Sequence, residues 1–508
     1  MKITQLNSAS LADVDERLAR PTYDRSQVAV GIAHFGVGGF HRSHQAMYLD
    51  HLLNKGEGFE WGICGIGLMP TDQVMSEVLS RQDNLYTLVT RATNGEREAQ
   101  VIGSIVRCLY APDQPDDVLD VLVDERTRIV SLTITEGGYN LDPVTGRFDP
   151  TTPDVAQDLR REPGQAPRTV FGYVIEALRR HWEAGRPPFT IMSCDNIPAN
   201  GDIARTAFSA FAALVDAELG ERVQSEVAFP SSMVDRITPI TTPGDIAELI
   251  EVYGIDDAWP VISEPFAQWV LEDVFPTGRP PWEAVGVQLT DDVEPYELMK
   301  LRLLNAGHQA IAYAGHLAGH TFVHDAARDP ALAEFLLGYM THEAAPTLRP
   351  VPGINLDAYI HSLLERFANP SICDTIARLC AFASDRIPKF LLPVINDNLA
   401  NGREFARSAA VVACWARYAE AIDENGAPID VQDSLRDELI ARARQQRDNP
   451  LAFIENGSIF GALARNRDFA ERYRSTLESL HTMGTRRTIQ GLNASLATDN
   501  VDARSCQS

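Results

Sequence analysis

The sequence lacks the features that mark exported and membrane proteins. No run within its 508 residues approaches the roughly 18 consecutive apolar residues of a membrane span. Residues 1–20 contain no apolar segment of the kind found in signal peptides. The seven cysteines are dispersed and include no C-x-x-C pair, which argues against a disulfide framework and against a zinc ribbon. We therefore expect an unexported, cytoplasmic protein.

Basic side chains are also scarce. The chain has 45 Lys and Arg residues against 70 Asp and Glu residues, which gives a formal net charge of -25. No cluster of Lys and Arg offsets this charge locally, so a polyphosphate or an anionic membrane surface would be repelled. A G-x-S-x-G elbow and a Walker lysine loop are missing as well. We expect no nucleic-acid partner, no membrane partner, and neither a hydrolase nor a P-loop enzyme.

The sequence does contain enough apolar residues, 44%, for two globular domains. Before about residue 290, strand-like runs alternate with helix-like segments, and after it the pattern is almost wholly helical. We predict an α/β, Rossmann-like dinucleotide-binding domain over residues 1–290 and a mostly α-helical domain over 291–508. The strands are expected at 28–36, 60–67, 128–135 and 189–194, and the helices at 41–53 and 170–185.

A glycine-rich turn follows the first expected strand. The run "HFGVGGFHRSHQ" places glycines between that strand and a helix, which is the arrangement that lets a backbone approach a pyrophosphate closely. The match to G-x-G-x-x-G is incomplete because position 41 is histidine. A turn without a ligand remains an alternative. The candidate cofactor contacts are Gly36, Val37, Gly38, Gly39 and Phe40.

An acidic residue that holds the adenosine ribose usually follows the second strand of this fold, roughly 20 residues past the glycines. Asp72 is the candidate, although it comes later than that spacing. Its carboxylate would repel a 2′-phosphate, so it favours NAD over NADP. The alternative is that Asp72 only caps the helix at 72–80.

Polar residues also stand at the expected ends of later strands. Glu136 follows one strand, Asp195 and Asn196 follow another, and Asp235 with Arg236 lies in "MVDRITP". Each alone is as consistent with a turn as with a ligand contact. Because carboxyl ends of parallel strands meet at one rim, their combination favours a binding crevice.

His41 and His44, three residues apart, raise the question of a metal site. No carboxylate or cysteine accompanies them at ligand spacing, so we expect helix-terminus and packing roles and no metal.

The stretch at 297–316 carries polar residues on an otherwise apolar helix. On an ideal α-helix, Lys300, Asn305 and His308 lie at about 0°, 140° and 80°, within one half of the surface. Oxidation of an alcohol needs a proton acceptor, and a lysine desolvated near a positive nicotinamide has a lowered pKa suited to that role. Asn305 and His308 would polarise the same oxygen. The alternative is a lysine that reaches the surface above a satisfied polar core.

Several long motifs resemble the polyol-specific long-chain dehydrogenase/reductase family over residues 25–480. They are "GIAHFGVGGFHRSHQAMYLD", "SLTITEGGYN", "MSCDNIPANG", "MVDRITP", "GIDDAWPVISEPFAQWVLED" and "PYELMKLRLLNAGHQA". The resemblance implies a zinc-independent, often monomeric enzyme. It also implies an active site in a cleft between a dinucleotide-binding domain and a helical domain.

The resemblance assigns roles to the catalytic candidates. It implies that Lys300 is the general base, that Asn305 and His308 bind the reacting oxygen, that Asn196 assists them, and that Glu297 relays the proton of the base to solvent.

It also implies substrate contacts at Asp235 and Arg378. Arg386 stands where the family has a lysine, and Thr71 where an acidic residue often precedes the one matched by Asp72. Because arginine is larger and forked, polyol selectivity is expected to shift.

The activity implied is reversible oxidation of D-mannitol to D-fructose with NAD⁺, so that the partners are a small polyol and its ketose. The alternatives are a D-arabinitol dehydrogenase, a hexuronate reductase such as fructuronate reductase, and a non-catalytic sugar or nucleotide sensor. A sensor would not need the complete Lys, Asn and His set.

Overall fold

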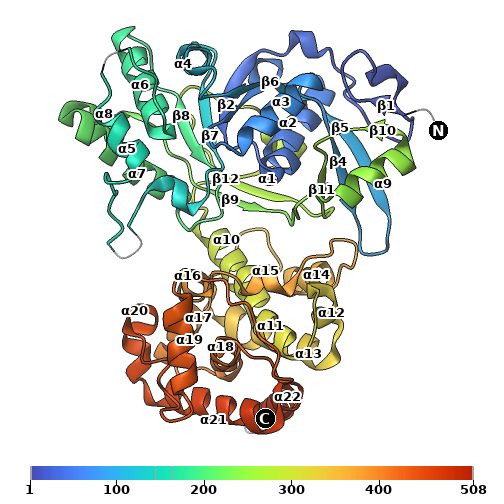
Figure 1. Cartoon of the computed structure of the whole chain (residues 1–508), viewed down its shortest axis with the longest axis vertical. Coiled ribbons are helices and arrows are strands. Elements are labelled where there is room, and N and C mark those ends of the chain that lie inside the picture. Colours follow the sequence, from blue (N-terminus) through green and yellow to red (C-terminus); the bar gives the residue numbers. More distant parts are fainter. Residues whose placement is uncertain (1–2, 143–144, 163, 506–508) are drawn as a thin grey trace. The chain divides into compact units, whose positions relative to one another are not determined.

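The computed structural model describes residues 3–142, 145–162 and 164–505 (Figure 1). The chain divides into two compact units, Met1–Glu294 and Pro295–Ser508.

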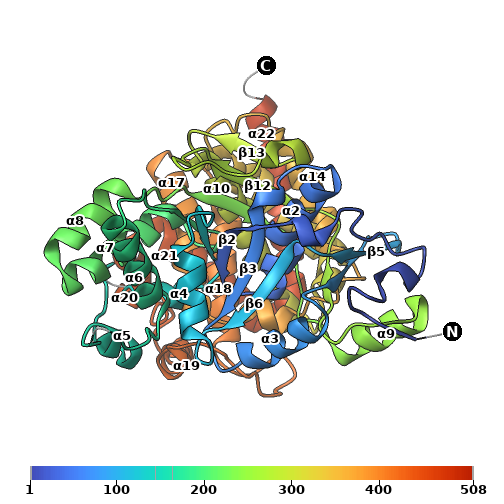
Figure 2. The same cartoon turned by 90° about the horizontal axis from the view of Figure 1, so that it is seen from above.

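The amino-terminal unit is built on a five-stranded parallel sheet, with the strand order β6-β3-β2-β7-β8. The chain starts in the middle at β2 and adds β3 and β6 on one side, which lie side by side in Figure 2. It then returns to add β7 and β8 on the other side, so the strand order reverses between β2 and β7. The predicted α/β fold and its four expected strands are confirmed. The strands are β2 (Val30–Phe35), β3 (Gly62–Gly67), β6 (Ile105–Tyr110), β7 (Ile129–Leu132) and β8 (Thr190–Ser193).

Both faces of this sheet are covered by helices. Alternate residues of each strand enter opposite cores: Ile32 packs with the α2 and α3 side, and Phe35 with the α4, α6 and α7 side. Strands buried on both faces read as continuous apolar runs, which explains why they were recognisable in the sequence. The helices of this unit are α1 (Gly39–Ser43), α2 (Gln45–Asn54), α3 (Asp72–Arg81), α4 (Pro115–Val123), α5 (Pro153–Asp158), α6 (Val170–Glu183), α7 (Asn200–Val215), α8 (Ala217–Glu226) and α9 (Pro243–Tyr253).

Smaller sheets complete the unit, and the sequence patterns did not identify them. Two three-stranded sheets have the orders β11-β4-β5 and β13-β12-β9, each with one antiparallel pair, and β1 pairs with β10. Most of their strands are short, and partners such as Leu88 and Val261 lie far apart in sequence. The strands are β1 (Thr4–Gln5), β4 (Tyr86–Arg91), β5 (Arg97–Ile102), β9 (Ser232–Asp235), β10 (Ile255–Asp256), β11 (Val261–Ser263), β12 (Gln268–Glu272) and β13 (Gln288–Thr290).

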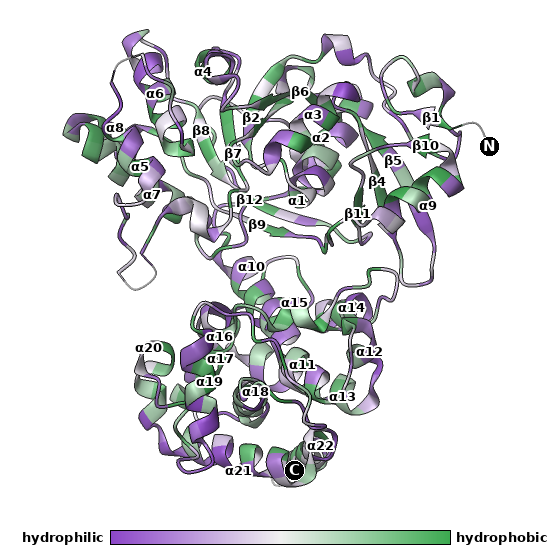
Figure 3. Ribbon diagram, in the orientation of Figure 1, coloured by the Kyte–Doolittle hydropathy of each residue, from purple (hydrophilic) through white to green (hydrophobic). Residues whose placement is uncertain are grey.

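The carboxy-terminal unit is helical, as expected. Its central helix is α18, which is buried along nearly its whole circumference and packs against α11 and α21. Helix α21 buries only one stripe, including Phe469, Tyr473 and Leu477, and its purple and green banding in Figure 3 shows this amphipathic pattern. The helices are α10 (Glu294–Met299), α11 (Ala306–Leu317), α12 (Val323–Arg328), α13 (Pro330–Tyr339), α14 (Leu356–Phe367), α15 (Ile376–Cys380), α16 (Ala383–Phe390), α17 (Leu392–Ala400), α18 (Ala406–Tyr418), α19 (Arg436–Gln445), α20 (Gly457–Phe460), α21 (Arg467–Met483) and α22 (Thr485–Ser505).

The cysteines within the described residues form no disulfide. Four of them are buried, Cys108 is half-buried, and Cys373 is exposed. Burial raises the pKa of Cys194 and of Cys414 to about 12.

None of the helices in the described part of the chain combines the length and apolar character that crossing a membrane requires.

Candidate active site

The glycine turn lies where β2 and β7 separate, at the reversal of strand order. Gly36 has φ +93°, and a Cβ there would lie 2.1 Å from the carbonyl oxygen of Thr133. Only glycine fits this position. A Cβ on Gly38 would meet nothing closer than 3.9 Å, and one on Gly39 nothing closer than 3.5 Å. These are ordinary van der Waals distances, so the two positions are not crowded, and their place between β2 and α1 fits the approach of a pyrophosphate.

A network of buried polar side chains on β2 and at the end of β7 holds the glycine turn in place. His34 contacts the Ser131 hydroxyl through Nδ1 at 2.8 Å, and through Nε2 it contacts the Gly36 carbonyl at 3.2 Å and Thr133 Oγ1 at 3.0 Å. Thr133 also donates to the Gly36 carbonyl at 2.6 Å. Burial lowers the pKa of His34 to about 3, so the ring stays neutral. The turn is thus held by uncharged hydrogen bonds.

The two histidines that raised the metal question have packing roles. His41 stacks on His34 with a centroid distance of 3.4 Å, and His44 Nε2 contacts the Gln268 carbonyl at 2.9 Å. The helix expected over 41–53 is also not continuous, because His44 has φ -121° and ψ -93° and separates α1 from α2. Among the described residues, no group of three or more His, Cys, Asp or Glu side chains is placed to hold a metal ion.

Asp72 lies at the start of α3, just after β3. Its Oδ2 accepts hydrogen bonds from the backbone N–H groups of Leu68 at 3.0 Å and Met69 at 2.9 Å. It therefore braces the turn between β3 and α3 and does not act as the N-cap, which is Thr71. Oδ1 makes neither of these two bonds.

The remaining candidates of this unit follow later strands. Glu136 begins the short 3-10 helix η4 (Glu136–Tyr139) after β7, and Asn196 is exposed just after β8. Asp235 is the buried last residue of β9, which belongs to a different sheet. The Ser232 hydroxyl donates to the Ser193 carbonyl at 2.7 Å and so joins β9 to β8. All three residues are brought to the carboxyl-end side of the main sheet.

Arg236, next to Asp235, is structural. Its guanidinium donates to the Glu264 carbonyl at 3.0 Å and also to the Ser43 carbonyl at the end of α1. Burial lowers its pKa to about 10, so it remains a cation at neutral pH. Arg236 ties β9 to the helix that follows the glycine turn.

In the carboxy-terminal unit the candidates lie on one continuous helical segment, but its geometry differs from the ideal α-helix assumed above. Residues Lys300–Asn305 form a π-helix, η6, between α10 and α11. The Ala306 N–H donates to the Leu301 carbonyl, an i to i+5 bond. Residues five apart are therefore about one turn apart here, and Asn305 lies above Lys300 instead of about 140° away.

The side of the helix that carries Lys300 and Asn305 continues into the helices on either side of the π-turn. Glu297 is one α-helical turn before Lys300, and His308 is one turn after Asn305. The π-turn thus aligns four polar residues on one face.

Hydrogen bonds with other segments of the carboxy-terminal unit stabilise the π-turn. The Tyr339 hydroxyl donates to the Arg302 carbonyl at 2.9 Å. The Arg302 guanidinium donates to Asp397 at 2.6 Å and to the Thr347 carbonyl at 3.0 Å. A π-turn disturbs the regular helical bonding, and these contacts stabilise the altered backbone.

The side chains on this face are largely shielded from water. Lys300 is 6% exposed and Asn305 is 8% exposed, so Lys300 does not reach the surface as the alternative required. His308 is half-buried, and its ring stacks on Phe367 with a centroid distance of 4.1 Å.

The two candidate substrate arginines lie on α15 and α16. Arg378 Nε donates to Asp374 Oδ1 at 2.6 Å, and a second bond joins Nη2 to Asp374 Oδ2. This bond raises the pKa of Arg378. Arg386 donates to the carbonyls of Arg378 at 3.3 Å and Leu379 at 3.4 Å, close to the end of α15. Helix α11 packs against both α15 and α16.

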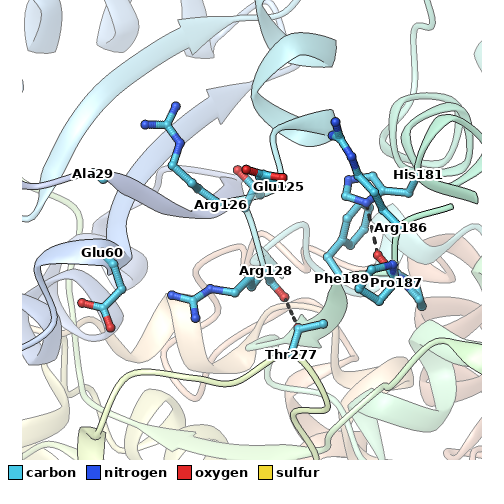
Figure 4. Close-up of a pocket in the computed structure, with 12 residues that line it drawn as sticks. Ala29, Glu60, Glu125, Arg126, Arg128, His181, Arg186, Pro187, Phe189 and Thr277 are labelled. Atoms are coloured by element: carbon cyan, nitrogen blue, oxygen red, sulfur yellow. Dashed lines mark hydrogen bonds between the residues drawn. The ribbon is translucent and has the colours of Figure 1, made fainter. Parts of the chain in front are cut away.

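A cavity of about 460 Å³ lies elsewhere, beside residues that precede β2, β7 and β8 (Figure 4). Arg128 lies in it with its guanidinium over the Trp61 ring at 3.6 Å. No predicted site residue lines this cavity. It is at the amino ends of the strands, whereas α/β sheets bind cofactors at the carboxyl ends.

Comparison with known families matches both units. Residues 30–284 match the family described as "Mannitol dehydrogenase Rossmann domain", and residues 292–481 match the one described as "Mannitol dehydrogenase C-terminal domain".

Individual relatives are similar over nearly the whole chain. A mannitol 2-dehydrogenase of Neosartorya fischeri is 43% identical over 466 residues, covering 91% of this chain and 93% of that protein. Mannitol dehydrogenase 2 of Saccharomyces cerevisiae is 41% identical over 484 residues, covering 95% and 96%.

Solved structures give the same result. The ternary complex of Pseudomonas fluorescens mannitol 2-dehydrogenase with NAD and D-mannitol has a TM-score of 0.87 and 43% identity, covering 96% of this chain and 99% of that one. A substrate-free D-sorbitol dehydrogenase has a TM-score of 0.88 and 34% identity, covering 95% and 100%.

Proposed function

The chain belongs to the mannitol dehydrogenase family, and on that basis we propose that it oxidises D-mannitol to D-fructose with NAD⁺ and catalyses the reverse reduction. The observation that carries the proposal is the π-turn, because it places Lys300 and Asn305 on one face beside Glu297 and His308. A proton acceptor and oxygen-binding groups on one stripe are what alcohol oxidation requires.

The amino-terminal unit provides the cofactor site. The uncrowded backbone of Gly38 and Gly39 between β2 and α1 suits the pyrophosphate, with Val37, Phe40 and Glu136 as further contacts. Asp72 is assigned to the adenosine ribose through Oδ1, and its negative charge favours NAD over NADP. When bound, NAD⁺ supplies the hydride acceptor.

Lys300 is assigned as the general base. Its amine takes the hydroxyl proton of the polyol during oxidation and returns it during reduction. Glu297, one turn earlier on the same face, passes that proton to solvent. Asn305, His308 and Asn196 hold the reacting oxygen, which becomes alkoxide-like in the transition state.

Substrate specificity is assigned to Asp235, Arg378 and Arg386. The Asp235 carboxylate accepts hydrogen bonds from substrate hydroxyls. Since Asp374 already neutralises Arg378, the site favours an uncharged polyol over an anionic hexuronate. Arg386 is anchored on backbone carbonyls and presents a fixed fork where the family has a flexible lysine.

A second candidate substrate is D-sorbitol, because one similar structure is a D-sorbitol dehydrogenase.

We further propose a monomeric, cytoplasmic enzyme, as the sequence and its resemblance suggest. Light scattering during gel filtration tests the first point and cell fractionation the second.

The first experiment measures NADH formation with D-mannitol, D-arabinitol and D-sorbitol in parallel, repeated with NADP⁺. We expect the highest kcat/KM with D-mannitol and NAD⁺, and D-fructose as the product by NMR. A dominant rate with another polyol would reassign the substrate. No rate with any polyol would contradict the proposal.

The Lys300→Ala variant separates an enzyme from a sensor. We expect turnover to fall by about 10²- to 10⁴-fold, since general-base catalysis contributes that much, while NADH still binds. Lys55→Ala is the control, because Lys55 is exposed and its amine donates to the Ala284 carbonyl in the amino-terminal unit. Equal turnover in both variants would contradict the assigned base.

A further inference from the structure

A buried carboxylate joins two of the loops that carry site residues. Asp195, 6% exposed, accepts hydrogen bonds from the N–H of Thr135 at 2.7 Å and of Ile134 at 3.1 Å. The Tyr139 hydroxyl lies 2.7 Å from the same carboxylate and 2.6 Å from Ser193 Oγ. Asp195 follows β8, whereas residues 134–139 follow β7, so its side chain fastens one strand end to the next.

The backbone that Asp195 holds is in an unusual conformation. Thr135 has φ +64° and ψ 169°, a region that a β-branched residue rarely occupies. Such a conformation persists only where neighbouring groups impose it. Glu136 is the next residue, so the peptide held by Asp195 sets the position of Glu136.

A buried amide extends the connection to a third strand. Asn200 Nδ2 donates to the carbonyl of Asp195 at 3.0 Å and to that of Ser232 at 2.8 Å. Asn200 Oδ1 accepts from the Ser232 N–H at 2.9 Å. Ser232 begins β9, the strand that ends at Asp235.

We propose that Asp195, assisted by Asn200, is a positioning residue that sets the relative placement of Glu136, Asn196 and Asp235. These residues follow or end three different strands and have assigned roles toward cofactor, reacting oxygen and substrate hydroxyls. Asp195 acts through the backbone and itself contacts neither cofactor nor substrate. The inference rests on the proposed function.

The test compares Asp195→Asn with a matched variant, Asp158→Asn. Asp158 is also 6% exposed and also accepts from two backbone N–H groups, those of Arg168 at 2.9 Å and Thr169 at 2.8 Å, and from one hydroxyl. It is the last residue of α5, and its partners Arg168 and Thr169 directly precede α6; no site residue is assigned there. Both substitutions turn one accepting oxygen into a donating amide.

We expect both variants to lose similar thermal stability, but only Asp195→Asn to change the reaction. Its kcat should fall about tenfold or more, which corresponds to about 1.4 kcal/mol. Its KM for the polyol should rise, and the primary deuterium isotope effect with 2-deuterated D-mannitol should increase. If both variants keep the kcat, KM and isotope effect of the wild type once corrected for folded protein, the proposal is overturned.

Two further measurements keep the result decisive. If Asp195→Asn does not fold, Tyr139→Phe removes the hydroxyl bonds to Asp195 and Ser193 but keeps the ring. It should shift kcat and the isotope effect in the same direction by a few-fold, whereas wild-type values would overturn the proposal.

If the wild type oxidises no polyol, the proposed function fails, and the affinity for NADH then tests the positioning role of Asp195 separately. Weaker NADH binding in Asp195→Asn but not in Asp158→Asn supports positioning of Glu136, and equal affinity in the two variants refutes it.

Discussion

Asp72 shows how one carboxylate serves both the fold and the assigned cofactor site. Oδ2 braces the turn after β3 through the N–H groups of Leu68 and Met69. A Cβ on Gly67 would lie 2.6 Å from the Cβ of Asp72, so the strand must end in glycine for the carboxylate to sit there. The structural and cofactor roles therefore use different atoms.

This division predicts the effect of Asp72→Asn. Asparagine keeps one oxygen that accepts both N–H groups but removes the charge that opposes a 2′-phosphate. We expect the ratio of kcat/KM for NADP⁺ to that for NAD⁺ to rise by about tenfold, which corresponds to about 1.4 kcal/mol, with little change in Tm. Asp24→Asn is the control, because Asp24 makes comparable bonds to Ser26. An unchanged ratio would remove Asp72 from the cofactor site.

The buried, neutral ring of His34 leads us to expect that the folded protein loses stability in acid. Burial lowers its folded-state pKa to about 3, below the ordinary value of 6.5, so protonation favours the unfolded chain. Its contribution is complete above about pH 6.5 and is lost as the pH falls below that value, by up to about 1.4 kcal/mol per pH unit.

Urea unfolding of the wild type and His34→Gln at pH 7, 6 and 5 measures how the contribution of His34 to the free energy of unfolding changes with pH. The difference in the free energy of unfolding between the two proteins should shrink as the pH falls, because glutamine does not titrate. His361→Gln replaces an exposed histidine and serves as the control. Parallel pH profiles for wild type and His34→Gln would contradict the prediction.

Among the elements, the π-turn η6 has the clearest consequence for chemistry. The Tyr339 hydroxyl binds the Arg302 carbonyl within this turn, so Tyr339→Phe removes an external support. We expect a loss of about 1 kcal/mol in stability, typical of one hydrogen bond, and a several-fold fall in kcat as Lys300 and Asn305 lose their alignment. The comparison variant is Tyr418→Phe, whose hydroxyl contacts the Asp430 carbonyl at 3.4 Å. A similar kcat in both variants would show that the π-turn does not depend on Tyr339.

The elements also show what sequence patterns can and cannot provide. Four of the five strands of the parallel sheet were predictable because both of their faces are buried and their sequences are mostly apolar. The fifth, β6, was not predicted, since it is an edge strand that is only partly buried and contains Arg107. Short strands such as β9 and β11 were not, since their partners are distant in sequence.

The local geometry of the helices was also beyond the sequence patterns. Spacing alone assumes an α-helix, so it could not place Asn305 above Lys300 or detect the break at His44. The motif residues themselves were identifiable, whereas the part played by Asp195 depends on contacts with a loop some 60 residues earlier in the chain.

For the whole molecule, the division into two units predicts an uneven response to cofactor. NADH at about 100 times its Kd should stabilise the folded state by about 2.7 kcal/mol. In hydrogen exchange, we expect protection of amides in residues 31–40 and 133–139, around the glycine turn. Amides of α18 and α21, in the core of the other unit, should show the smallest change. Protection confined to the carboxy-terminal unit would contradict the assigned site.

The cysteines offer a practical consequence. Of those that the structure describes, only Cys373 is exposed. It precedes Asp374, the partner of Arg378. With Cys506 replaced by serine, a maleimide fluorophore would react fastest at Cys373 without an engineered cysteine, because the other described cysteines are buried or half-buried. Its emission would then report, in real time, the arrival of a sugar beside the arginine assigned to bind it.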